Sequence, residues 1–114
     1  MTWTREHDRI IAEKCQGLRV VVDRHAYWVT DDRGLWEPLP QYCAYLPHTV
    51  RAAEAWRKQD EEARSWSISS PEYGDAGMRG ICYNGRPSDW RTKSAYSEQP
   101  AAALAHALYQ AVAG

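Results

Sequence analysis

The segment from Asn84 to Lys93 concentrates side chains that could bind an anion: two guanidiniums, an ammonium, two hydroxyls and an indole. An arginine can clamp a phosphate through two parallel hydrogen bonds, and a tryptophan can stack on a nucleobase or a guanidinium. We therefore predict a binding site for a phosphate-bearing ligand or an acidic protein surface. The alternative is a solvated hairpin loop whose tryptophan folds onto the sheet edge. The predicted contact residues are Arg86, Trp90, Arg91 and Lys93, with Tyr73 from another loop on the same side.

The aromatic residues are six Trp and seven Tyr, with no Phe. Trp and Tyr carry a polar N–H or O–H, so they suit surfaces that are apolar at one end and wet at the other. The composition indicates either a binding surface or a core whose rings have polar tips at its edge. Trp28, Trp36 and Tyr42 lie close together in the sequence, and we predict that they form an exposed patch through which the chain self-associates.

Signatures of catalysis are missing from the sequence. There is no phosphate-binding loop, no dinucleotide fingerprint and no His-Glu-x-x-His pair. The three cysteines form no Cys-x-x-Cys, and with the four histidines they match no usual zinc-ligand spacing, so we interpret them as reduced thiols. We expect a non-enzymatic protein with no catalytic residues, no metal and no cofactor.

The charge balance and the N-terminus indicate where the chain works. Fourteen Lys and Arg against fifteen Asp and Glu give a formal charge of −1, which favours neither stable nucleic-acid binding nor an acidic membrane. The first residues lack the apolar stretch of a signal peptide, and no apolar run approaches a membrane span. We expect a cytoplasmic protein with one domain over residues 1–114, a length typical of single domains.

Hydrophobic periodicity and capping residues predict the elements that position these side chains. Thr4 and Gly17 bracket a first helix, and Pro47 and Pro100 suit the first turns of two others. We expect strands over 18–22, 27–29, 65–69, 78–83 and about 90–95. The order helix, two strands, helix, two or three strands, helix predicts an α+β fold: an α/β/α sandwich whose mainly antiparallel sheet of four or five strands carries helices on both faces. The predicted core is Ile10, Ile11, Val20, Val22, Val50, Trp56, Trp66, Ile68, Leu104 and Leu108.

Three parts of the chain resemble the phage ABA sandwich domain family, small proteins of bacterial viruses and prophages. Residues 8–17 (DRIIAEKCQG) are similar to that family's opening helix, which runs into a glycine. Residues 41–48 (QYCAYLPH) and 52–56 (AAEAW) resemble its Pro/Tyr loop and the following helix, and residues 97–104 (SEQPAAAL) resemble the start of its closing helix. The resemblance implies an α/β/α sandwich and a viral origin, and it implies no site residues.

Two binding functions follow as hypotheses. The first is an anti-defence protein of a phage that sequesters a nucleotide-type immune signal of the host, often as a homo-oligomer; this reading is an analogy with other small viral proteins. The alternative is an inhibitor or adaptor that covers a host defence protein with an aromatic and arginine-rich surface.

Overall fold

The computed structural model describes residues 2–31, 33–70, 77–86 and 91–113. These residues form three helices and six strands in the order α-β-β-β-α-β-β-β-α. The helices are α1 (Arg5–Gln16), α2 (Leu46–Lys58) and α3 (Pro100–Ala113). The strands are β1 (Arg19–Asp23), β2 (Ala26–Thr30), β3 (Trp36–Pro38), β4 (Arg64–Ser69), β5 (Met78–Asn84) and β6 (Arg91–Ser97).

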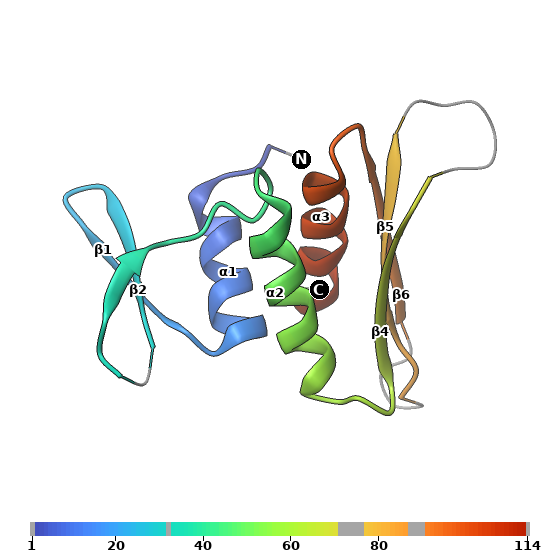
Figure 1. Cartoon of the computed structure of the whole chain (residues 1–114), viewed down its shortest axis with the longest axis horizontal. Coiled ribbons are helices and arrows are strands. Elements are labelled where there is room, and N and C mark those ends of the chain that lie inside the picture. The colour runs from blue at the N-terminus through green and yellow to red at the C-terminus, as the bar shows by residue number, and fades with distance from the viewer. Residues whose placement is uncertain (1, 32, 71–76, 87–90, 114) are drawn as a thin grey trace.

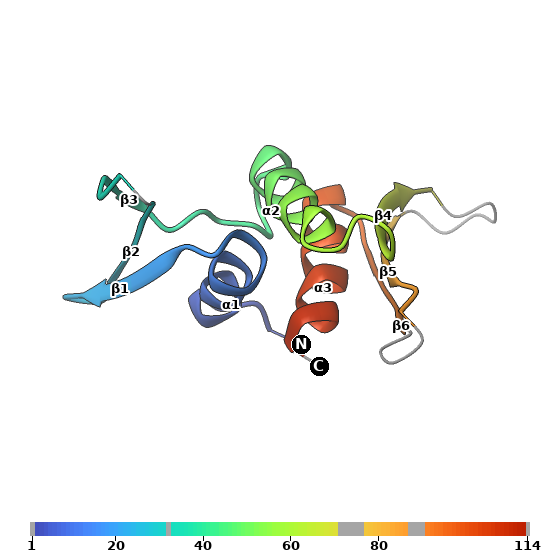
Figure 2. The same ribbon diagram turned by 90° about the horizontal axis from the view of Figure 1, so that it is seen from below.

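The strands form two separate antiparallel sheets, with the helices between them (Figure 1). Sheet A has the order β1-β2-β3 and sheet B the order β4-β5-β6. The turned view shows the same arrangement, with sheet A extending from the α1 side and sheet B lying against α3 (Figure 2). The mixed α+β class and the antiparallel pairing are therefore confirmed.

The prediction of one sheet of four or five strands with helices on both faces is wrong, because the two hairpin regions never join. α2 separates them in the chain, and β3 limits sheet A to three strands. Pro38 has no backbone N–H to donate to a further strand, and Pro40 follows it closely. The layers are thus sheet, helices, sheet.

Local signals place the helix ends where the sequence predicts them. Thr4 is the N-cap of α1, and its backbone N–H donates to His7 Nδ1 over 2.9 Å. Gly17 ends the helix in the left-handed region with φ 65°, a conformation that glycine adopts without strain. Pro47 and Pro100 lie in the first turns of α2 and α3, where the missing proline N–H costs no helical hydrogen bond.

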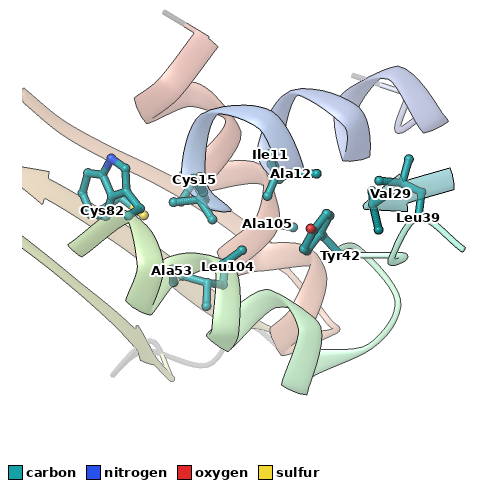
Figure 3. Close-up of a cluster of buried hydrophobic side chains, with 14 residues drawn as sticks. Ile11, Ala12, Cys15, Val29, Leu39, Tyr42, Ala53, Cys82, Leu104 and Ala105 are labelled. Atoms are coloured by element: carbon teal, nitrogen blue, oxygen red, sulfur yellow. The ribbon is translucent and has the colours of Figure 1, made fainter. Parts of the chain in front are cut away.

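The hydrophobic core lies among the three helices and reaches the inner side of each sheet (Figure 3). Val29 and Leu39 enter it from the sheet A side, and Cys82 enters it from sheet B. Cys15 of α1 is buried near Cys82, and burial raises the pKa of each thiol to about 12. Of the predicted core, the fully or almost fully buried members are Ile11, Trp56, Leu104 and Leu108.

Val22 is a wrong core prediction, because its side chain is 47% exposed. It lies next to the end of β1, where the β1–β2 hairpin extends away from the helices (Figure 1). The predicted alternation in β4 is confirmed, since Trp66 and Ile68 are half-buried while Ser65, Ser67 and Ser69 are exposed.

Candidate functional site

Trp28 and Trp36 lie on the same face of sheet A, as the strand register shows. Trp28 pairs with Val21 of β1, and Trp36 pairs with Thr30, two residues along β2 from Trp28. Paired residues and residues two apart share a face of a sheet. We call this surface, formed by Val21, Asp23, Trp28 and Trp36, the tryptophan face.

The tryptophan face is both exposed and hollowed. Trp28 is 38% and Trp36 51% exposed, and the four residues line a cavity of about 350 Å³. Three of the lining side chains are apolar, and Asp23 provides a carboxylate at the hairpin end. A hollow between exposed indoles can take up an apolar side chain of a partner, and the carboxylate favours a neighbouring cation.

A tight turn sets this geometry. Arg24 and His25 connect β1 to β2 with φ values of 49° and 68°, as a two-residue turn of the primed type requires. The turn aligns Asp23 with Ala26 and, by the period of two, Val21 with Trp28. Val21 and Asp23 are not among the residues predicted from the sequence, although a Val-rich run separated from Trp28 by a short turn indicates that its residues pair with the strand of Trp28.

Tyr42 does not belong to this surface, which corrects the predicted patch. Its side chain is fully buried, its hydroxyl donates to Gln16 Oε1, and its backbone N–H donates to Asp8 Oδ1 over 3.0 Å. Burial raises the pKa of the phenol. Tyr42 therefore fixes the loop before α2 onto α1 and offers no ring to a partner of the folded chain.

Asp8 of α1 also contacts this loop through hydrogen bonds. It is 2% exposed and accepts hydrogen bonds from Trp3 Nε1 (2.9 Å), Arg5 Nη1 (2.7 Å) and the Tyr42 backbone. Burial is the largest influence and raises the pKa of its carboxyl. Arg5 also donates to the carbonyls of Leu39 and Pro40. These donors account for the buried carboxylate as a structural group.

Arg86, the first residue of the predicted anion site, is already engaged by a carboxylate. Its Nε and Nη2 donate to the two oxygens of Asp60 over 2.7 and 2.6 Å. Asp60 belongs to the turn between α2 and β4, and the hydrogen bond from Arg86 lowers the pKa of its carboxyl. The two guanidinium N–H groups that would bind a phosphate therefore already donate to the carboxylate of Asp60.

The other predicted anion-site residues are not brought together by the described part of the chain. Lys93 is half-buried and pairs with buried Cys82, so it shares the helix-facing side of sheet B. Arg91 pairs with Asn84 through its backbone. Trp90 and Tyr73 lie outside the described residues.

Within the described ranges, no group of three or more His, Cys, Asp or Glu could hold a metal ion. No helix among those residues has the length and apolarity needed to cross a membrane.

One solved structure has the same fold over the whole chain. It is a phage protein from Bacillus cereus ATCC 14579, with a TM-score of 0.71 and 13% sequence identity, covering 100% of this chain and 91% of that one. At this identity the likeness concerns the fold. Models of known protein families give no match, and no curated protein matches the chain.

Proposed function

We propose that this chain is a non-enzymatic phage protein that binds a host defence protein through the tryptophan face. The observation that carries the proposal is the pair of exposed indoles, Trp28 and Trp36, around an apolar hollow on a sheet that extends from the body of the molecule. Tryptophan is enriched among residues that dominate protein–protein binding energy. The shared fold with a phage protein supports the phage origin.

The electrostatics of the face favour a protein over a nucleotide. Asp23 lines the hollow, and a carboxylate there repels the phosphates of a nucleotide. Arg86, the arginine expected to clamp a phosphate, is paired with Asp60. We expect a partner surface that presents an apolar side chain flanked by Lys or Arg.

The test compares single-residue variants of the two faces of the molecule. Trp28→Ala and Trp36→Ala should each weaken binding to the host partner by roughly 2 kcal/mol or more, the scale of a binding hot spot. Tyr96→Ala is the matched control, because Tyr96 is 66% exposed but lies on sheet B. Binding is measured by calorimetry, and protection of a phage from the host defence is measured in cells expressing each variant.

Two results would contradict the proposal. One is unchanged binding and protection with both tryptophan variants while Tyr96→Ala abolishes them. The other is a nucleotide that copurifies with the wild-type chain, is released on denaturation, and is retained by the Trp28→Ala and Trp36→Ala variants.

A further inference from the structure

The outer edge of β1 is open and poorly protected against pairing. The order β1-β2-β3 gives β1 a single strand neighbour among the described residues, and β1 lies at the margin of sheet A (Figure 2). Its residues are Arg-Val-Val-Val-Asp, with neither proline nor lysine. Such an edge is a template for another strand.

The other strand edges carry features that discourage self-pairing. β3 has three residues and ends in Pro38, and β6 contains Arg91 and Lys93 with no carboxylate. β4 contains Arg64 and likewise no carboxylate to face it in a second copy. β1 alone among these edges has one residue of each charge sign, at its two ends.

The hairpin turn determines which backbone groups of β1 point outward. In a two-residue hairpin, the residues that flank the turn, here Asp23 and Ala26, exchange both of their backbone hydrogen bonds. Because the pattern alternates, Arg19 and Val21 also direct their backbone groups to β2. Val20 and Val22 therefore present their N–H and C=O groups to the open edge.

We propose that β1 pairs antiparallel with β1 of a second copy of this chain, across a two-fold axis at Val21. In this register each Val20 faces Val22 of the other copy, and these are the residues whose backbone groups point outward. Val21 faces its own copy in a non-hydrogen-bonded pair, and each Arg19 faces Asp23 in the same kind of pair, where side chains approach most closely.

The charges select this register from its neighbours. With a two-fold axis at Val20 or at Val22, Arg19 of one copy does not face Asp23 of the other. With the axis at Val21, Arg19 of each copy faces Asp23 of the other, which forms two ion pairs. Neither residue forms an ion pair within the described part of the chain, so each is available. Arg19, Val21 and Asp23 lie on the side of the tryptophan face. Pairing thus joins the tryptophan faces of two copies into one surface, independently of what that surface binds.

The test is a charge reversal and its rescue, measured by sedimentation equilibrium over about 5 to 500 µM protein. The wild-type chain should dimerise in the micromolar range, since a strand-edge contact is small. Arg19→Asp and Asp23→Arg should each weaken dimerisation roughly ten-fold or more, because each places like charges opposite one another at two symmetric positions. The double variant Arg19→Asp/Asp23→Arg should restore the wild-type dissociation constant.

Two further variants separate this register from other contacts. Val22→Pro removes an outward N–H without removing a hydrogen bond to β2, so it should abolish the dimer while the melting temperature of the monomer changes little. Glu37→Arg, a charge reversal on exposed β3, should leave the dimer unchanged. A wild-type monomer at every concentration overturns the proposal. So does a dimer that survives both single reversals, or a double variant no stronger than the singles. Arg19→Asp and Val22→Pro keep all four residues of the tryptophan face, so with these two variants partner binding by the monomer stays a separate measurement.

Discussion

Gly80 determines how closely β5 approaches α3. A Cβ atom placed on Gly80 would lie 2.4 Å from the backbone oxygen of Ala103 and 2.6 Å from the backbone nitrogen of Leu104. Helix backbone cannot give way as the end of a flexible side chain can, so the strand and the helix must separate. We expect Gly80→Ala to destabilise the fold by about 1–3 kcal/mol, the usual cost of overpacking.

The measurement is urea denaturation, and the control is Ser67→Ala on the neighbouring strand. Ser67 is exposed on the outer face of sheet B, so its change should stay within about 0.5 kcal/mol. Equal midpoints for Gly80→Ala and the wild type would show that α3 and β5 lie farther apart than described.

Leu108 is the clearest core leucine that the sequence predicts, and the structure buries it completely. Leu108→Ala should cost about 2–5 kcal/mol, the range for deleting a packed leucine. Val22→Ala is the informative comparison, because both residues are predicted to be core and only Leu108 is buried. In dilute protein the Val22 change should cost less than about 0.5 kcal/mol in chemical denaturation. A larger loss for Val22 than for Leu108 would contradict the assignment.

At the residue scale, the sequence predicts the structural roles of residues whose contacts lie close to them in the chain. Thr4, Gly17 and Pro100 are recognised by their neighbours in the chain, and Trp66 and Ile68 by simple alternation. The pairing of Arg86 with Asp60 could not be predicted, because Asp60 lies 26 residues earlier and composition cannot show such a pair. Tyr42 was misread for a similar reason, since α1 covers it.

Among the elements, the turn after α2 and the loop after β5 are joined by the Asp60–Arg86 pair. Gly85 adds a backbone hydrogen bond to the Ala63 carbonyl over 2.8 Å. The hydrogen bond from Arg86 holds the pKa of Asp60 below the ordinary value of an aspartate carboxyl, so the pair stabilises the fold at pH values above that ordinary value. The stabilisation is lost as the pH falls through the folded-state pKa.

We therefore expect Arg86→Gln to lower the urea midpoint slightly at pH 7, and we expect this difference from the wild type to shrink as the pH falls below the ordinary range of an aspartate carboxyl. Arg51→Gln, at an exposed position of α2, controls for the loss of a positive charge, since the described residues give Arg51 no ion pair. A difference between Arg86→Gln and the wild type that kept its size as the pH was lowered would assign the effect to packing instead.

The order of elements could be predicted except for β3, and the arrangement of the strands in two sheets could not be predicted. Hairpins were recognisable from β-branched runs and turns, but β3, with only Trp36–Pro38, has too few residues to show an alternation. Whether two hairpin regions join in one sheet depends on contacts between residues far apart in the chain. Trp28 and Trp36 of the tryptophan face could be predicted from the sequence, whereas Val21 and Asp23 could be assigned to it only from the strand register.

The whole molecule, with its layer of helices between two sheets, has principal extents of 45 × 33 × 21 Å. The two sheets are supported unequally. Sheet B packs along α3, with Gly80 in backbone contact, whereas sheet A touches the helices mainly through α1 and the buried side chains of Val29 and Leu39. The surface proposed to bind partners thus lies on the less supported sheet, where changes of sequence disturb the core least.

The rate at which the two buried thiols are alkylated measures how often the core opens. Cys15 and Cys82 lie near each other in the core but come from different elements, α1 and β5, and their raised pKa values keep them protonated at pH 8. Alkylation of either requires the layers to part, so its rate reports how often they do. Half-buried Cys43 should react first, and Cys15 and Cys82 should then react together at one slow rate. Mass spectrometry of the modified peptides would distinguish this from a Cys15 rate that exceeds that of Cys82, which would mean that α1 detaches and rejoins while sheet B and α3 remain closed.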